Sequence, residues 1–504
     1  MRRALFFAAL VFLLANVPAQ DQFDYFLAYK DLADGFSGLT QSSNAFVRTP
    51  FYLAQVRTRT NPAPATEKPY DLLKLLDLYL RNNPSVRTSE EAVLVAYGNL
   101  GGAQAQRLPV FKLETTGTYI GNPPGPIVIK KGEFGIVENP VMPGTNVFLP
   151  PEDVKIYDGM ESTLYQFKLS GDMPLWTWGK INLGIEAGKL GIEAARISLE
   201  KTIHEGSIRL RGIYETLGYL DRMLGILSLQ RNIGARLLSI SEQSQKAGFI
   251  TMTELLSVKM NIKEIDIAIL QLREQQNKLL NELSFLAGAS SITMEDLDLE
   301  VKSLEYYPGS AETVYETVLA ENYDLRLGLA YIEAKKKLVE LAKVQANGLP
   351  DLGLHLEVSY SGPRFPFIET DWARKDDWQL TMSIATMGNI FGNPVKKADA
   401  QKAVSELGEA EAKLEEGRKN LLSFVQTSWS NTLLIKARIE YNLLKQQVSI
   451  EELGAKRFTI SVGSGSEAEL LNSVIKALSG LADAYTLCIN HRTELLSLDL
   501  VQGK

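Results

Sequence analysis

The chain of 504 residues contains one cysteine and three histidines, and this scarcity removes several functional classes. Cys488 has no second cysteine with which to form an intramolecular disulfide, so packing alone must hold the chain together. The histidines, His204, His355 and His491, have no metal-binding spacing, and His204 is not followed by a second histidine four residues later. We therefore expect neither a disulfide framework nor a metal site.

Positive charge is also limited. The chain carries 53 Lys and Arg residues against 60 Asp and Glu, a formal net charge of −7, and it has no basic block that could follow a phosphate backbone. Nucleic acid is therefore not expected as a partner. The segment Gly463-Ser-Gly465 lacks the third glycine and the preceding strand of a dinucleotide-binding loop, so it indicates a flexible turn. No other group of residues favours catalysis, and we expect neither an enzyme nor a cofactor.

Long apolar runs are absent beyond the amino terminus. The first residues, MRRALFFAALVFLLANVPAQ, combine a basic start, an apolar run and a small-residue end at Ala19, which predicts a signal peptide over residues 1–19. No cysteine near the cut could accept a lipid anchor. No later stretch reaches the ~18 apolar residues that a spanning helix needs. Any membrane insertion of the processed chain would therefore have to use a closed barrel of strands.

What the sequence does contain is an ordered internal duplication, which is sought before any other feature. Four pairs of segments match in the same order. They are RNNPSVR (81–87) with AENYDLR (320–326), LPVFKLETTGTYIG (108–121) with LPDLGLHLEVSYSG (349–362), YQFKLS (165–170) with WQLTMS (378–383), and KAGFITMTELLSVK (246–259) with SVGSGSEAELLNSV (461–474). The order predicts a first repeat over 70–290 and a second over 291–504, preceded by an extension, 20–69, of unknown role.

Each repeat contains a pair of alternating segments, 108–176 and 349–390, that predict strand hairpins. Every second residue from 352 to 360 is apolar or aromatic, and the returning strands show the same alternation. The residues between them are polar and include Lys112, Glu114, His355 and Glu357. Such a face suits a wet lumen, although a half-buried soluble sheet also alternates. The loops 122–162 and 363–376, the first rich in proline and glycine, are not expected in a core.

After each strand pair, apolar residues recur at steps of three and four, which is typical of long packed helices. The first hairpin would turn near Gly248 and the second near Gly463. The apolar positions form a seam along each hairpin. The seam of the first hairpin contains Leu210, Ile213, Leu217, Leu220, Leu224, Leu227, Leu255, Val258, Ile262, Ile265, Ile269, Leu272, Gln276, Leu279, Leu283 and Leu286. The seam of the second hairpin contains Leu471, Val474, Leu478, Leu481, Tyr485, Cys488, Arg492 and Leu495. A helix over 181–246 would be roughly 100 Å long, which does not fit the inside of a compact enzyme.

Four strands are too few to close a barrel, because about eight are needed to leave room for interior side chains. Two arrangements remain open. Either the sheet lies against helices in a soluble protein, or several chains pool their strands.

The Asn-Asn-Pro of 82–84, the Leu-Pro strand starts, the glycines at Gly179 and Gly392 and the duplicated helical tips resemble the outer-membrane efflux protein family, the TolC-like channels. The resemblance covers roughly residues 70–503. It implies an α+β membrane protein: a homotrimer with a twelve-stranded β-barrel, four strands from each chain, continued by a long α-helical coiled-coil tunnel through the periplasm. The barrel would lie in outer-membrane lipid, and its lumen would be lined by Lys112, Glu114, His355 and Glu357.

The resemblance also implies a function. Such a chain would be the exit duct of a tripartite efflux or type I secretion system, and would pass small molecules or proteins from an inner-membrane transporter, through a periplasmic adaptor, to the exterior. The helical tips would dock the adaptor, and the residues concerned are Gly248, Glu254, Leu255, Gly463 and Leu470.

The second tip would carry the gate. In the family, two inward acids narrow the pore at positions that correspond here to Glu469 and Asn472. Three copies of Glu469 would form a ring of carboxylates that attracts cations, weaker than a ring of two acids per chain. Alternatively, Glu254 and Glu469 are acids that the dipole of a helix N-terminus favours. The family's tyrosine and arginine latch is replaced by Ile460 and Gly465.

Two rival classes and two open side-chain roles remain. A periplasmic adaptor has one helical hairpin flanked by β-domains, whereas this chain has two hairpins, each after its own strand pair. A periplasmic or surface coiled-coil scaffold or adhesin without channel activity would explain the helical seams but not the duplicated strands. Trp176 and Trp178 suit either a membrane-interface belt or core packing. Cys488 is expected to be a small buried side chain on the helical seam.

Overall fold

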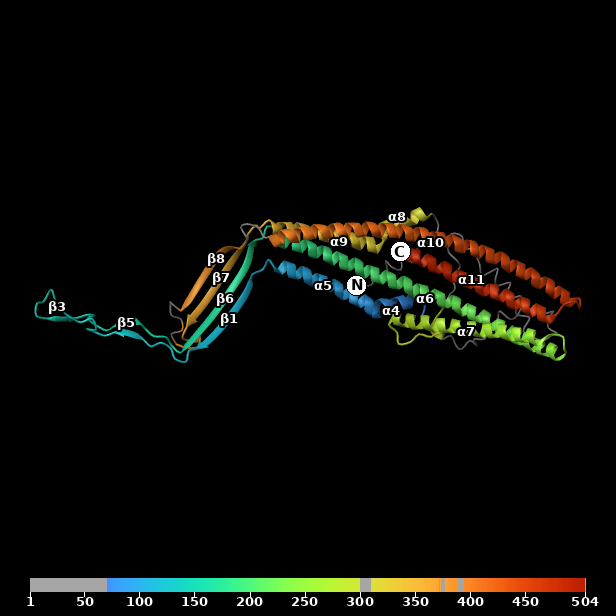
Figure 1. Ribbon diagram of the computed structural model, residues 1–504, viewed down its shortest axis with the longest axis horizontal. Helices are drawn as coiled ribbons and strands as arrows, with labels where there is room; N and C mark the ends of the chain where they lie inside the picture. The colour runs from blue at the N-terminus through green and yellow to red at the C-terminus, as the bar shows by residue number, and fades with distance from the viewer. Residues whose placement is uncertain (1–69, 300–309, 371, 373–376, 388–393, 504) are drawn as a thin grey trace. The chain divides into compact units, whose positions relative to one another are not determined.

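The computed structural model describes residues 70–299, 310–370, 372, 377–387 and 394–503 (Figure 1). The predicted signal peptide, the extension 20–69 and Gly392 lie outside the described residues. The described helices are α4 (Leu72–Asn82), α5 (Pro84–Ala105), α6 (Lys180–Lys246), α7 (Met252–Ala287), α8 (Ala311–Glu321), α9 (Tyr323–Ala346), α10 (Pro394–Ser461) and α11 (Glu467–Gln502). The long strands are β1 (Val110–Tyr119), β6 (Thr163–Trp176), β7 (Asp351–Gly362) and β8 (Trp378–Met387).

The chain forms two compact units, and both repeats contribute to each of them. Unit 1 comprises the described residues within Met1–Ala96, Gly191–Ile332 and Glu409–Lys504, and unit 2 those within Tyr97–Leu190 and Glu333–Gly408. Unit 2 therefore holds the strands, and unit 1 holds the helical hairpins. The division into repeats 70–290 and 291–504 is a division of sequence, and each repeat runs through both units.

The four long strands form one antiparallel sheet in the order β1-β6-β7-β8. β1 pairs with β6 and β7 with β8, as the predicted hairpins require, and the pairing of β6 with β7 joins the two repeats. Within the described residues, β1 and β8 are the edge strands of this sheet. A four-stranded sheet with two free edges is what several chains would have to pool in order to close a barrel.

Between β1 and β6 the chain forms short strands that sequence reasoning did not anticipate. β2 (Ile127–Ile129) pairs with β5 (Val154–Tyr157), and β3 (Ile136–Glu138) pairs with β4 (Asn146–Phe148), each as a separate two-stranded ladder. Residues 120–162, here called the arm, are therefore a long β-ribbon and not a plain loop (Figure 1).

The helical seams lie in the cores of unit 1, as predicted. One core joins α4, α6 and α7, with Leu217 and Leu283 fully buried. The other joins α6, α10 and α11, and Cys488 is buried there among apolar side chains. Because α6 contributes to both cores, it holds the two hairpins together. Gln276, the polar position in the first seam, is buried as well. Among the described helices, none has an apolar stretch long enough to cross a membrane.

Each repeat also contains an equivalent junction between two helices, at which a buried asparagine lies. Asn83 lies between α4 and α5; its Nδ2 donates to the carbonyl of Leu286 at 2.9 Å and its Oδ1 accepts from the amide of Ser85 at 2.8 Å. Asn322 lies between α8 and α9 and donates to the carbonyl of Val501 at 2.8 Å. Both asparagines are buried, so each satisfies carbonyl groups at a helix end that would otherwise lack partners.

Candidate functional site

The polar face of the sheet carries a row of charged side chains. Lys168 Nζ lies 2.9 Å from Glu357 Oε2, His355 Nε2 lies 3.2 Å from the same oxygen, and His355 Nδ1 lies 2.7 Å from Asp172 Oδ1. We call these four residues the charge ladder. It crosses β6 and β7, where the two repeats meet.

The register puts the predicted lumen residues on this same face. Lys112 lies opposite Ser170, which in turn lies opposite Glu357, and Glu114 lies opposite Lys168. Sequence reasoning missed Lys168 and Asp172, although both fall between the apolar positions of β6 and could have been assigned by alternation.

The opposite face of the sheet is apolar, and the described chain leaves much of it exposed, except near the loop 363–376, where Phe365 packs on Tyr165 and Phe167 and Tyr360 is buried. Leu113 is 68% exposed, and on β8 Leu380, Met382 and Ile384 are 59–69% exposed. One face is thus charged and the other is bare hydrocarbon, the alternation that a wet lumen and a lipid boundary require.

Two tryptophans lie at the helix-side end of this sheet. Trp176 is the last residue of β6, and its ring meets that of Trp178 edge to face with centroids 6.0 Å apart. Trp178 has a positive φ of 55° and donates from Nε1 to the carbonyl of Pro350 at 2.8 Å. Both rings are exposed, so neither packs in a core of this chain.

The two helical tips have the same backbone geometry. Gly248 and Gly463 both have φ of 79°, a left-handed conformation that glycine adopts without strain. At the first tip the amide of Phe249 donates to the carbonyl of Ser244 at 2.9 Å, and at the second the amide of Ser464 donates to the carbonyl of Thr459 at 3.0 Å. Both are Schellman closures, which explains why the glycine recurs in each copy.

The acids that follow these glycines differ in what they contact. Glu254 belongs to a capping box: its Oε2 accepts from the amide of Thr251 at 2.7 Å, and its own amide donates to Thr251 Oγ1 at 3.2 Å. Glu469 occupies the equivalent position in α11, but the N-cap residue Ser466 makes no side-chain cap bond. Within the described residues, the exposed carboxylate of Glu469 has no hydrogen bond or ion pair.

The remaining tip residues are divided between core and surface. Leu255 and Leu470 are buried, whereas Asn472, one turn beyond Glu469, is exposed. Phe249, directly after Gly248, is 83% exposed. Sequence reasoning passed over Phe249, whose signal is an aromatic residue in a solvent-facing turn.

An ion cluster lies deeper, where α6 meets α11. Arg492 makes a bidentate contact with the buried Glu215, and Arg211 Nε donates to Glu215 Oε1 at 3.0 Å. Burial acts to raise the pKa of Glu215, but the bonds and charges of the two arginines outweigh it and hold that pKa below its usual value. The adjacent His491 is fully buried; burial, followed by the charges of Arg492 and Lys436, lowers its pKa to about 4.

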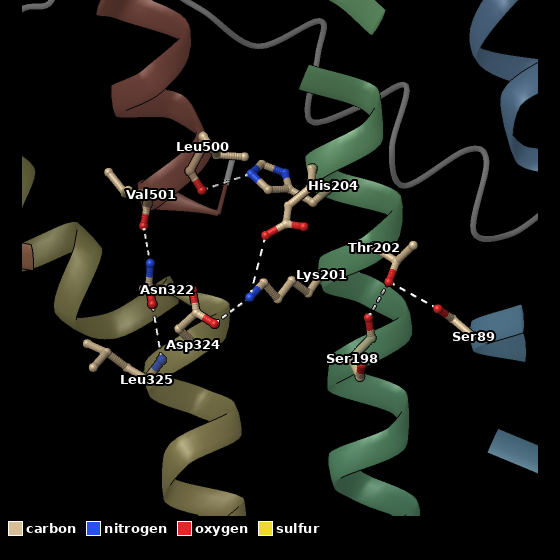
Figure 2. A network of polar contacts seen from close by, with 11 residues as sticks. Ser89, Ser198, Lys201, Thr202, His204, Asn322, Asp324, Leu325, Leu500 and Val501 are labelled. Atoms are coloured by element: carbon tan, nitrogen blue, oxygen red, sulfur yellow. Dashed lines mark hydrogen bonds and ion pairs between the residues drawn. The ribbon is translucent and has the colours of Figure 1, made fainter. Parts of the chain in front are cut away.

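His204 takes part in a different polar network at the asparagine junction of the second repeat (Figure 2). Its Nε2 lies 3.2 Å from the carbonyl of Leu500, and its ring packs against Tyr323 with centroids 5.3 Å apart. Figure 2 also shows Lys201, whose Nζ lies 2.5 Å from Asp324 Oδ1. The histidine therefore joins α6 to the end of α11. In the part of the chain that the structure describes, no cluster of three or more His, Cys, Asp and Glu side chains could hold a metal ion.

Comparison with solved structures identifies this architecture. The CmeC outer-membrane channel of Campylobacter jejuni superposes with a TM-score of 0.67 at 14% identity over 97% of this chain and 93% of that one. The outer-membrane protein VceC of Vibrio cholerae gives 0.65 at 15% identity, over 86% of this chain and 96% of that one. The MtrE outer-membrane channel of Neisseria gonorrhoeae, in its open state, gives 0.63 at 14% identity, over 86% and 88%.

The chain has the fold of these outer-membrane channels. This confirms the TolC-like fold that the sequence resemblance implied, with two helical hairpins and a four-stranded sheet. The sequence itself matches no protein-family model and no curated protein. At identities of 14–15% the likeness is one of backbone architecture, so the roles of individual side chains must be argued from their own surroundings.

Proposed function

We propose that this chain is the outer-membrane exit duct of a tripartite efflux or type I secretion system, and that it is not an enzyme. The observation that carries the proposal is the sheet: one face charged, the other apolar and exposed, and an edge strand on each side. Three such sheets, joined β8 to β1, supply the strands of a barrel with a wet lumen and a lipid-facing surface. The fold likeness to outer-membrane channels agrees with this.

The helical hairpins support a homotrimer. Apolar residues with heptad-like spacing remain exposed on two surfaces of unit 1 that the described residues leave uncovered. On α7 they are Leu256, Met260, Ile267 and Leu270, and on α10 they are Leu434, Tyr441, Leu444, Val448 and Phe458. Two different seams on one subunit make a head-to-tail contact, which closes into a ring when it repeats around an axis. Seam pairing between neighbouring chains would build the walls of a helical tunnel.

The charge ladder and its neighbours Lys112 and Glu114 would line the lumen near the junction of the repeats. Acids and lysines alternate along this wall, and such mixed charge keeps the surface hydrated without one strong field. Trp176 and Trp178, exposed at the end of the strands, would lie at the membrane interface, where aromatic rings with one polar atom are favoured.

At the second tip, Glu469 and Asn472 would form the periplasmic gate. Glu469 is exposed and outside any capping box, so its charge is available to the pore, whereas Glu254 is engaged in capping its own helix. The tip turns at Gly248 and Gly463 would dock a periplasmic adaptor that leads to an inner-membrane transporter. Leu255 and Leu470 would support that surface from within, and the exposed Phe249 would supply apolar contact.

The proposal is tested by cell fractionation and by the mass of the purified protein. The processed chain should fractionate with the outer membrane and should run as a detergent-resistant trimer. If the chain is a coiled-coil scaffold, the protein should stay in solution without detergent. That result would contradict the proposal of an exit duct.

A further inference from the structure

The arm, residues 120–162, is a feature that the duct itself does not require. It leaves the sheet after β1, runs out along β2 and β3, and returns through β4 and β5 to the start of β6. Its turn contains Asn139, whose amide donates to the carbonyl of Thr145 at 2.8 Å. In Figure 1 the ribbon lies beyond the end of the sheet at which β1 ends and β6 begins. The other loop between paired strands, 363–376, is much shorter.

Large apolar side chains cover the arm, and the described chain leaves them exposed. Phe134, Ile136, Val141, Met142 and Ile156 are each at least 57% exposed, and Val141 at the turn reaches 83%. A two-stranded ribbon is only marginally stable by itself in water. Apolar exposure on this scale marks a surface that meets a partner.

Charge narrows the choice of partner. The arm has three lysines and six acidic residues, so anionic lipid headgroups would be repelled, and identical arms can approach one another only through their apolar faces. Some of this charge is already engaged within the arm: Lys155 Nζ lies 2.8 Å from Asp158 Oδ1, and the amide of Lys131 donates to Asp153 Oδ1 at 2.7 Å. The surface that remains for a partner includes the exposed apolar side chains named above.

The prolines of the arm indicate how a partner would contact it. Pro126 lies directly before β2, and Pro140 and Pro150 lie two residues beyond the ends of β3 and β4. Proline has no amide hydrogen and protects strand edges from pairing with an added strand. Contact through the side chains on the faces of the ribbon is therefore favoured over extension of its ladders.

The position at which the arm leaves the sheet indicates which molecule it contacts. β1 is an edge strand, so in the proposed trimer the arm leaves the barrel next to the boundary between two chains. Three identical arms tethered at one rim are held at an effective concentration in the millimolar range, where weak apolar contacts persist. We propose that the three arms pack on one another through their apolar faces and form a collar over the exit. This proposal rests on the trimeric duct proposed above.

Cysteine cross-linking tests the collar in the full-length protein. The variant Val141→Cys places a thiol at the turn, and Ile368→Cys, at a position that is 77% exposed on the other loop, is the matched control. The native Cys488 is buried, and burial raises the pKa of its thiol to about 12, so it contributes little background. A short bis-maleimide should join Val141→Cys chains into dimers and trimers at about ten times the yield of Ile368→Cys, because packing of the arms adds to the tethering that both positions share. Adding Ile136→Asn should lower that yield, and Phe134→Cys provides a second thiol position if Val141→Cys assembles poorly.

The mass of the detergent-solubilised particle separates the two proposals. A trimer whose arms cross-link no better than the control overturns the collar and leaves the duct standing. A trimer in which the thiol of Val141→Cys is shielded only after reconstitution into lipid vesicles assigns the arm to the membrane and also overturns the collar. A monomer overturns both.

Discussion

Arg492 on α11 holds Glu215 on α6 through two hydrogen bonds across 277 residues of sequence, and the pair joins the second repeat to the first. Both side chains are nearly buried, with 12% and 8% exposed. Arg211 adds a second positive charge to the same carboxylate. A buried ion pair is weak evidence for net stability, but the loss of one member leaves a charge that the interior cannot solvate.

Replacing Arg492 with methionine should therefore destabilise unit 1, by less than the about 3–5 kcal/mol of a fully unpaired buried charge because Arg211 still bonds Glu215. The matched control is Arg209→Met, because Arg209 pairs with Glu282 at 2.5 Å on the surface, with 66% and 33% of the two side chains exposed. That change should cost no more than about 1 kcal/mol. Thermal unfolding followed by helical circular dichroism compares them, and equal shifts for the two variants would show that the buried pair has no special weight.

Burial of His491 predicts a pH dependence. Its pKa is about 4 in the folded chain against 6.5 as the ordinary value, so the unfolded chain binds the proton more tightly between these limits. The contribution of neutral His491 to the free energy of unfolding should be fully present above pH 6.5. It should fall by about 3 kcal/mol as the pH decreases toward 4. The variant His491→Gln should flatten this part of the profile when the unfolding midpoint is measured at a series of pH values. An unchanged slope would mean that His491 does not titrate in this range.

Two glycines of α6 should respond oppositely to alanine. A Cβ at Gly206 would collide with the ring and hydroxyl of Tyr79, which donates to the carbonyl of Thr202 at 2.8 Å. Gly206→Ala should cost about 1–3 kcal/mol because the aromatic ring must move in a packed core. A Cβ at Gly225 meets nothing within 4 Å, so Gly225→Ala should stabilise the helix by up to about 1 kcal/mol. Unfolding midpoints of the two variants, measured side by side with the wild type, test this difference. Destabilisation by both substitutions would contradict the packing described for α6.

Neighbouring residues of β8 should respond oppositely to arginine. Leu380 lies on the exposed apolar face, while Thr381 lies on the polar face opposite Glu357. Leu380→Arg should cost about 2–4 kcal/mol if that face meets hydrocarbon, and should reduce the yield of trimer in the outer membrane. Thr381→Arg should assemble normally, since it faces a carboxylate in a wet lumen. If both variants assemble equally well, the assignment of the two faces fails.

The sequence predicted the elements whose pattern is periodic. Alternation located the strands of the sheet, and steps of three and four located the seams through Leu217 and Leu283, because burial on one face constrains every second residue of a strand and every third or fourth of a helix. Lys168 and Asp172 obey the same alternation and were within reach of that reasoning.

Other features depend on contacts that no local pattern records. The Glu215–Arg492 pair joins distant segments, and from the sequence Arg492 was placed only among the residues of the second seam. The acids Glu254 and Glu469 are equivalent in sequence, yet only Glu254 closes a capping box, because its N-cap is Thr251 whereas Ser466 makes no such bond. The strand pairs β2–β5 and β3–β4 of the arm were not predicted, because its many prolines indicated a loop.

Single-channel conductance in a planar bilayer tests the central claim most directly, with residues 20–504 as wild type, Glu469→Gln and Glu254→Gln. The last variant is the matched control, since glutamine keeps the capping box. The duct predicts cation-preferring conductance in the wild type and in Glu254→Gln, and a reduced cation preference in Glu469→Gln, because a ring of three carboxylates is lost. Conductance with the same selectivity in all three proteins would remove the gate at Glu469 and keep the duct. No conductance from any of them, with a protein that stays in solution without detergent, would contradict the duct itself.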